Sequence, residues 1–122
     1  MPRVLLTCSE NVLCEKLRQS FLSHAECEVY GGMKNTADII SRASEVHPDL
    51  VILEMAGDLQ GALDTAEQLK RIFPRVPLFL VTREHSMAAE KEALHRGIDA
   101  VFRSEDDFPS LVMNARAVCG LE

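Results

Sequence analysis

Short apolar runs alternate along this chain with longer stretches in which apolar residues recur at helical spacing. A short run of branched aliphatic residues is typical of a strand that is buried on both faces. Apolar residues that recur every three or four positions predict a helix with one buried side. The runs that predict strands are 4–7, 26–30, 50–53, 78–81 and 100–102.

The first two helical stretches follow the first two predicted strands. Leu13, Leu17 and Phe21 recur at a spacing of four and therefore share one face of the first helix. Asn35 or Thr36 is expected to cap the second helix, since short polar side chains favour that position. The second helix is expected to end at 47–48, because a residue before proline disfavours helical geometry.

The last three helices are expected over 62–73, over 86–96, and from a cap at Asp106 or Asp107 onward. Gly97 follows the fourth helix and is suited to the left-handed conformation that often ends a helix. The last helix is expected to bury one face. That face consists of Phe108, Leu111, Val112, Ala115 and Val118.

Five strand–helix units in strict alternation predict an α/β fold. Parallel strands joined by helical crossovers satisfy this order, with helices covering both faces of the sheet. We expect a three-layer, doubly wound sheet of five parallel strands, of the flavodoxin-like (βα)5 type. Ligands of such sheets bind at the carboxyl ends of the strands, so the residues just past each strand are the candidate site.

The length of 122 residues fits a single domain, which we expect over residues 1–120. Leu121 and Glu122 are a candidate cloning scar. Residues 1–3 lead directly into a strand without a signal-peptide pattern, and no apolar run approaches the roughly 20 residues of a membrane span. We therefore expect a cytoplasmic protein that does not enter a membrane.

The formal net charge of −6 argues against binding to nucleic acid, which needs clustered Lys and Arg. The four cysteines and four histidines are dispersed, without the close spacing of a zinc site. No Gly-rich phosphate loop follows the first strand, because residues 7–12 contain no glycine. A small enzyme or nucleotide binder of this fold is therefore disfavoured.

Residues 4–10 and 48–54 are each an apolar run that ends in small polar or acidic residues. These runs resemble the first and third strands of the receiver domain of two-component response regulators, the CheY-like family. The resemblance covers nearly the whole chain, and its best segments are 48–54, 76–82 and 97–105. It implies the flavodoxin-like fold and a role in phosphorelay signalling.

The family's pocket holds a divalent metal on two acidic residues and phosphorylates an aspartate. By the resemblance, the two metal-holding positions are Cys8 and Ser9, and the phosphoacceptor position is Glu54. The hydroxyl that binds the phosphoryl group is kept as Thr82, whereas the position of the family's lysine is Ser104. This set is a degenerate phosphoacceptor pocket.

Other positions near this pocket also depart from the family. Arg83 stands where a small residue is usual, and it or Arg103 is a candidate cover of the pocket. The aromatic switch position of the fifth strand is Val101. Only Glu10 and Glu54 are weak candidates for a metal, and thiol and hydroxyl groups are poor magnesium ligands.

These departures predict a pseudo-receiver: a regulatory or protein-interaction module that is not an enzyme and takes no cofactor. A single divalent ion would have too few fixed oxygens, and charge on a transferring phosphoryl group would not be neutralised. The alternative is a working receiver with an altered pocket that uses Glu54 or Asp58 and a weakly bound magnesium ion. Glu54 itself is either a mimic of a phosphorylated acceptor or a tolerated polar residue at a strand end.

The resemblance also implies where partners bind. In the family, the fourth helix, fifth strand and last helix form a face that contacts a partner or a second copy. Here that face corresponds to residues 86–96 and 106–116. We expect the partner to be a signalling protein or an output domain, and a homodimer through this face is a further expectation.

Overall fold

A computed structural model of the chain describes residues 1–7, 11–24, 27–31, 33, 35–54, 58–82, 86–103 and 105–120, with side chains for all of these except 11–14, 22–24 and 105. The elements run in the order β1 (Arg3–Thr7), α1 (Asn11–His24), β2 (Glu28–Tyr30), α2 (Thr36–Val46), β3 (Leu50–Leu53), α3 (Leu59–Ile72), β4 (Leu78–Val81), α4 (Met87–His95), β5 (Ala100–Phe102), a short 3-10 turn η1 (Glu105–Asp107) and α5 (Phe108–Val118).

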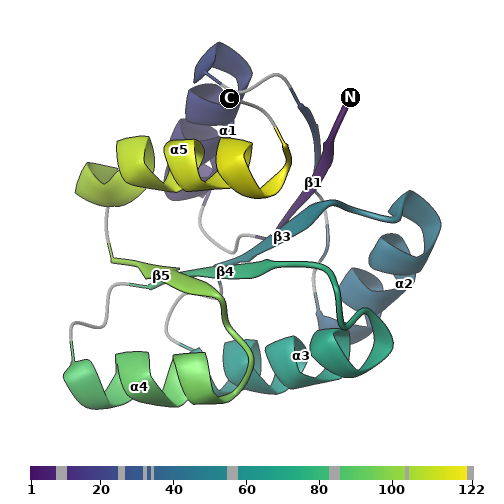
Figure 1. Cartoon of the computed structure of the whole chain (residues 1–122), viewed down its shortest axis with the longest axis vertical. Helices are drawn as coiled ribbons and strands as arrows, with labels where there is room; N and C mark the ends of the chain where they lie inside the picture. The colour runs from purple at the N-terminus through teal and green to yellow at the C-terminus, as the bar shows by residue number, and fades with distance from the viewer. Residues whose placement is uncertain are drawn as a thin grey trace.

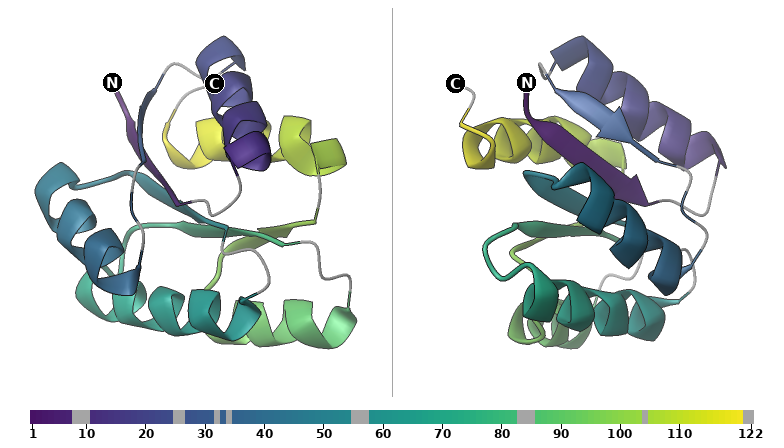
Figure 2. Two further views of the ribbon diagram at one scale, coloured as in Figure 1. Left: turned by 180° about the vertical axis from the view of Figure 1, so that it is seen from behind. Right: turned by 90° about the vertical axis from the view of Figure 1, so that its right-hand side faces the viewer.

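The five strands form one parallel sheet in the order β2-β1-β3-β4-β5. Helices α1 and α5 cover one face of this sheet, and α2, α3 and α4 cover the other (Figures 1 and 2). The predicted three-layer, doubly wound flavodoxin-like fold is confirmed. The order turns back between β1 and β3, so the carboxyl ends of these two strands mark the expected binding edge.

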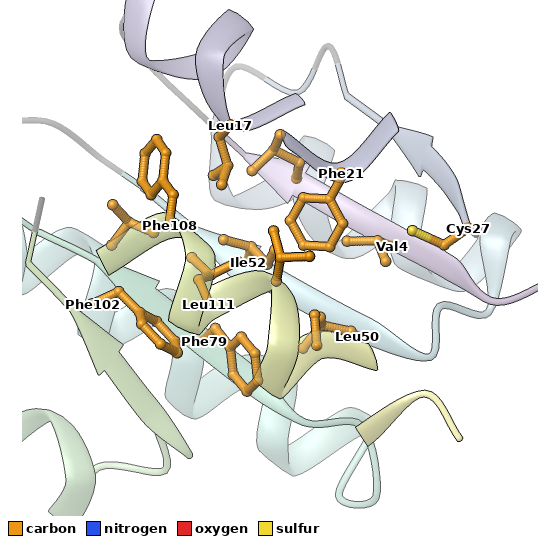
Figure 3. Close-up of a cluster of buried hydrophobic side chains, with 14 residues drawn as sticks. Val4, Leu17, Phe21, Cys27, Leu50, Ile52, Phe79, Phe102, Phe108 and Leu111 are labelled. Atoms are coloured by element: carbon orange, nitrogen blue, oxygen red, sulfur yellow. The ribbon is translucent and has the colours of Figure 1, made fainter. Parts of the chain in front are cut away.

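Alternate residues of the strands pack into two separate hydrophobic cores, one on each face of the sheet. The core under α1 and α5 is shown in Figure 3, where Ile52 and Phe79 of the sheet meet Phe21 and Leu111 of the two helices. The core on the other face takes Leu53 and the remaining alternate strand residues, together with residues of α2, α3 and α4. Strands buried on both faces explain why the sequence shows continuous apolar runs there.

Several predicted helix ends are confirmed by their capping contacts. The Asn35 side chain accepts a hydrogen bond from the backbone N–H of Asp38 at 2.9 Å, so Asn35 and not Thr36 caps α2. His47 ends α2 in the left-handed region with φ of 54°. Gly97 follows α4 with φ of 108°, as the sequence predicts.

Other predicted details are wrong. Helix α3 begins at Leu59, three residues before the predicted start, because Asp58 caps it through the backbone N–H of Gly61. Asp107 occupies the N-cap position of α5 without capping it, since its carboxylate accepts from the backbone N–H of Arg103 at 2.7 Å. Val118, predicted to be buried, is 44% exposed.

Candidate functional site

The ends of β1 and β3 meet at the expected edge of the sheet. The backbone N–H of Glu54 donates to the carbonyl oxygen of Thr7 at 3.0 Å and lies 3.3 Å from the Thr7 hydroxyl. Thr7 and Glu54 are both 3% exposed. The residue that the resemblance predicts at the phosphoacceptor position is therefore a buried glutamate that directly follows β3.

Burial of Glu54 matters because an acidic group away from water needs polar partners. Within the described part of the chain, every buried side-chain nitrogen or oxygen has a hydrogen-bond partner. Glu54 is thus accommodated as an integral polar group of the strand end.

The described residues alone do not form a metal site. Among the described residues, no three His, Cys, Asp or Glu side chains come close enough together to hold a metal ion. By the resemblance, a thiol and a hydroxyl, Cys8 and Ser9, are expected at the positions of the family's two acidic ligands. Magnesium prefers carboxylate and water oxygens, so a thiol and a hydroxyl are expected to be poor ligands for it.

Asp58, the alternative acceptor, has a structural role. Its side-chain oxygen accepts the backbone N–H of Gly61 at 2.9 Å and so caps α3. A Cβ atom added at Gly61 would collide with the Asp58 carboxylate, so the glycine makes room for this cap. The Asp58 carboxylate is therefore held at the start of the helix.

Thr82 lies at the end of β4 and is held beside β5, since its backbone N–H donates to the Phe102 carbonyl oxygen at 2.9 Å. Together with Val101 it lines a narrow crevice against α4, which we call the α4 crevice. Its volume is about 10 Å³, room for about one water molecule. The lining residues are Leu59, Leu80, Thr82, Ser86, Ala89, Glu90, Val101 and Arg103.

The α4 crevice is too small to accept an aromatic ring beside Thr82. Val101, which the resemblance predicts at the family's aromatic position, forms part of its wall. Sequence reasoning identified Thr82 and Val101 but missed Ser86 and Glu90 of the same crevice. Their position depends on how α4 packs, which no local pattern in the sequence specifies.

Arg103, a candidate cover of the pocket, is an exposed residue that follows β5. It lines the α4 crevice, and its backbone is held by the Asp107 carboxylate. The other sequence-predicted site residues lie outside the described part of the chain. These are Cys8, Ser9, Glu10, Arg83 and Ser104.

Two thiols far from this edge are placed in the core. Cys27 is buried, and Cys119 packs against the core under α1 and α5. Burial raises the pKa of the Cys27 thiol. Burial also raises the pKa of Cys119 to about 11, with smaller contributions from Asp49 and Cys27. Both thiols are therefore protonated at neutral pH and behave as small apolar side chains.

Sequence comparison finds response regulators. The response regulator protein VraR of Staphylococcus saprophyticus is 26% identical over 101 residues, which cover 82% of this chain and 48% of VraR. VraR of Staphylococcus aureus is 28% identical over 82 residues, which cover 66% of this chain and 37% of VraR. The chain thus spans half or less of the length of these relatives. No family model matches the chain.

Solved structures agree with the fold over nearly the full chain. The response regulator domain of Thermotoga maritima CheB superposes with a TM-score of 0.83 at 16% identity, covering 100% of this chain and 98% of that one. A LuxR-family DNA-binding response regulator of Staphylococcus aureus gives 0.80 at 20% identity, with 97% and 98% covered.

A Burkholderia thailandensis structure named for pilus assembly (CpaE) has the same fold, with a TM-score of 0.84 at 18% identity and coverage of 98% and 99%. The fold is therefore shared by proteins whose names differ in function, and it does not define the output. The sequence relatives are response regulators. None of the helices in the described ranges is long and apolar enough to span a membrane. This chain is therefore similar in sequence to response regulators and has the fold of their receiver domains.

Proposed function

We propose that this domain is a pseudo-receiver, which regulates a partner protein in the cytoplasm by direct contact and takes no phosphoryl group at position 54. The observation that carries the proposal is the buried Glu54 at the acceptor position, 3% exposed and integrated into the end of β3. Its extra methylene, relative to aspartate, also shifts the carboxylate from the place where the family's acceptor attacks phosphorus.

The chemistry of phosphoryl transfer supports the proposal. Catalysis of this transfer is positioning together with neutralisation of charge by metal ions and cationic side chains. The sequence offers Cys8, Ser9 and Ser104 where the family has two acids and a lysine. A phosphoryl donor would therefore meet little of the positive charge that stabilises its transition state.

The α4 crevice supports the second half of the proposal, the absence of a phosphoryl-driven switch. A receiver couples its hydroxyl residue to an aromatic side chain that changes position. Thr82 has Val101 as its neighbour in a crevice of about 10 Å³. If a phosphoryl group were added, position 101 would offer no aromatic side chain to change position, and the α4 crevice would have little space for an aromatic ring.

We further propose that the domain acts through the face formed by α4, β5 and α5, toward a signalling protein, an output domain or a second copy of this chain. Met87 on α4 and Met113 on α5 are 74% and 73% exposed. Large apolar side chains that protrude from these two helices are suited to a protein contact. In this role the domain is a signalling module and not an enzyme.

The direct test is treatment with acetyl phosphate and magnesium, followed by intact-mass measurement and Phos-tag electrophoresis. We expect no phosphoryl adduct on the wild-type domain or on Glu54→Asp. As a positive control, the combined substitutions Cys8→Asp, Ser9→Asp, Glu54→Asp and Ser104→Lys restore the family's pocket and are expected to produce an adduct.

The working-receiver alternative predicts the opposite result. A magnesium-dependent adduct on the wild-type domain that disappears in Glu54→Gln would establish position 54 as an acceptor and overturn the proposal. An adduct that disappears in Asp58→Asn would assign the acceptor to Asp58 and overturn it equally. Asn at position 58 keeps an oxygen for the α3 cap, so loss of the adduct in this variant would reflect loss of the acceptor carboxylate and not loss of the cap.

A further inference from the structure

Helix α4 has few apolar contacts with the rest of the molecule. Ala93 is the one buried residue of this helix, and its side chain is a single methyl group. Helix α3, in contrast, buries Ala62, Leu63, Thr65, Ala66 and Leu69. Since burial of apolar area is the main force that holds a surface helix, α4 needs another source of attachment.

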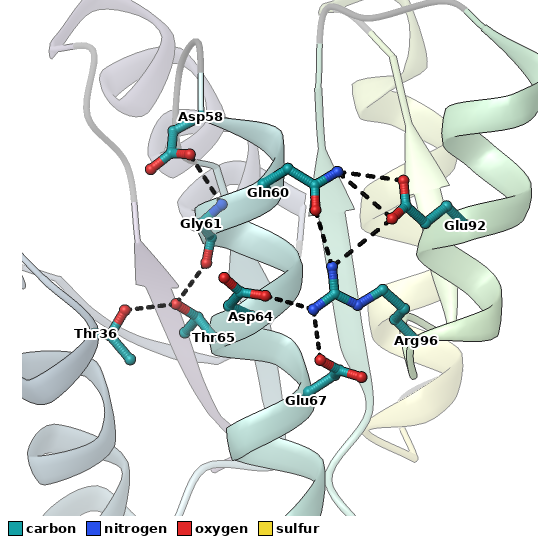
Figure 4. Close-up of polar contacts among 9 residues, drawn as sticks. All are labelled: Thr36, Asp58, Gln60, Gly61, Asp64, Thr65, Glu67, Glu92 and Arg96. Atoms are coloured by element: carbon teal, nitrogen blue, oxygen red, sulfur yellow. Dashed lines mark hydrogen bonds and ion pairs between the residues drawn. The ribbon is translucent and has the colours of Figure 1, made fainter.

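Polar contacts between α3 and α4 supply that attachment (Figure 4). The Arg96 guanidinium, at the C-cap of α4, donates from Nη2 to both Asp64 and Glu67 of α3. Its Nη1 donates to the side-chain oxygen of Gln60 at 3.1 Å and lies 3.8 Å from the Glu92 carboxylate. Gln60 in turn donates to Glu92 at 3.3 Å. We call these five residues the Arg96 cluster.

The Arg96 cluster joins more charged groups than an ordinary surface ion pair does. The Arg96 side chain is 18% exposed, although its acidic partners are largely open to solvent. One guanidinium bridges two carboxylates of α3 and one of α4, and such charge-assisted networks are stronger than isolated exposed pairs. The hydrogen bond to Glu67, and then the one to Asp64, raise the pKa of Arg96. A guanidinium keeps its charge at any pH at which a protein is folded.

The turn that follows α4 is held separately. Lys70 of α3 pairs with Asp99 at 2.9 Å, and the Asp99 carboxylate accepts the backbone N–H of Leu78 at 2.8 Å. The contacts of Lys70 and Asp99 therefore fix the start of β5 without the help of Arg96. A change at Arg96 should consequently act on α4 and leave the sheet in place.

We propose that the Arg96 cluster fixes the position of α4, so that ionic contacts with α3 hold this helix more than burial in the core does. The domain would then present its α4 surface in one position without a phosphoryl group. Loss of the cluster would release α4 while the two cores stay folded. The inference concerns α4 alone and does not depend on whether position 54 can be phosphorylated.

The test is native-state amide hydrogen exchange of the whole domain, without magnesium or phosphodonor. In Arg96→Gln we expect the amides of the last turn of α4 to exchange about five- to tenfold faster, while β4 and α5 keep the wild-type rates. The matched control is Arg75→Gln, which removes the same charge from an exposed turn residue and is expected to change no rate in α4.

A double variant, Asp64→Asn with Glu67→Gln, removes the α3 side of the cluster and guards against a folding defect peculiar to position 96. It is expected to raise the same α4 rates. Unchanged α4 exchange in both variants would show that the cluster does not hold the helix. An equal rise in every element would show a purely global effect on stability and would also overturn the inference. The result of the exchange experiment does not depend on whether the domain can be phosphorylated.

Discussion

At the scale of single residues, Asp58 and Gly61 form a matched pair. The Asp58 carboxylate accepts the backbone N–H of Gly61, and in its present position it occupies space that a Cβ at Gly61 would need. This pair places the start of α3 at Leu59, three residues before the predicted start. A carboxylate that sequence analysis proposed as an alternative acceptor is thus explained by helix capping.

The capping role predicts the effect of substitution at Asp58. Asp58→Ala should lower the free energy of unfolding by about 1 kcal/mol, because the N–H of Gly61 loses its side-chain acceptor. Asp58→Asn keeps a capping oxygen and should change stability by much less. Urea denaturation of the two variants measures the difference, and equal losses would contradict the cap.

Gly97 is required for two reasons, and both can be tested by one substitution. Its φ of 108° is unfavourable for any residue with a Cβ, and that Cβ would lie 3.0 Å from Cγ of Lys70. Gly97→Ala should therefore destabilise the domain by roughly 1–3 kcal/mol. Gly31→Ala is the control, since its Cβ would make only an ordinary contact of 3.6 Å with the Leu6 carbonyl oxygen. Thermal unfolding that ranks the two variants equally would refute this explanation.

At the scale of elements, α3 is tied to both of its neighbours. The buried Thr65 donates its hydroxyl proton to the Gly61 carbonyl oxygen at 2.9 Å, and Thr36 at the start of α2 lies 2.7 Å from the same hydroxyl oxygen. The Arg96 cluster links the opposite side of α3 to α4. Helix α3 is therefore the central element of this face, and its first turn follows the candidate site.

The link between α3 and α4 predicts a dependence of stability on pH. The hydrogen bond from Arg96, opposed in part by burial and by Asp64, lowers the pKa of Glu67 below its ordinary value of 4.5. Between this lowered pKa and about pH 4.5, the unfolded chain therefore binds more protons than the folded chain, and stability rises with pH. The contribution of Glu67 is complete above about pH 4.5 and is lost as the pH falls through the lower folded value.

The measurement is urea denaturation of the wild-type domain and Glu67→Gln at several pH values. We expect the wild type to be the more stable at neutral pH and the difference to shrink as the solution becomes acidic. A difference that stays constant down to about pH 3, well below the ordinary pKa of a glutamate, would contradict the ionic role of Glu67.

At the scale of the whole molecule, the sequence predicts the fold far better than the site. Continuous apolar runs such as 50–53 are unambiguous, because strands covered on both faces alternate between two cores. Contacts between distant segments leave no local pattern: Arg96 meets Gln60, Asp64 and Glu67 across 29 or more residues of sequence. The role of Asp107 was also missed, although its contact is local. Its carboxylate accepts a hydrogen bond from the backbone of Arg103 and does not provide the helix cap that its position predicts.

The packing of the whole domain also predicts the reactivity of its thiols. Burial raises the pKa of Cys119 to about 11 and raises that of Cys27, so both thiols should resist alkylation while the domain is folded. Iodoacetamide labelling near pH 8, read by peptide mass spectrometry, should modify them slowly and should accelerate many-fold in denaturant. Rapid labelling of the folded domain at either residue would contradict their placement in the core.

The central proposal, that this domain has no phosphoryl-type switch, is tested most directly by amide NMR with magnesium and beryllofluoride, which stands in for a phosphoryl group on a carboxylate. The resonances to follow are those of Glu54, Thr82 and Ser104. We predict no saturable shift at these residues in millimolar magnesium, with or without beryllofluoride, because the resemblance places a thiol, hydroxyls and a glutamate at the positions of the family's metal and phosphoryl ligands. Saturable shifts at all three residues would contradict the account and establish a phosphorylatable receiver.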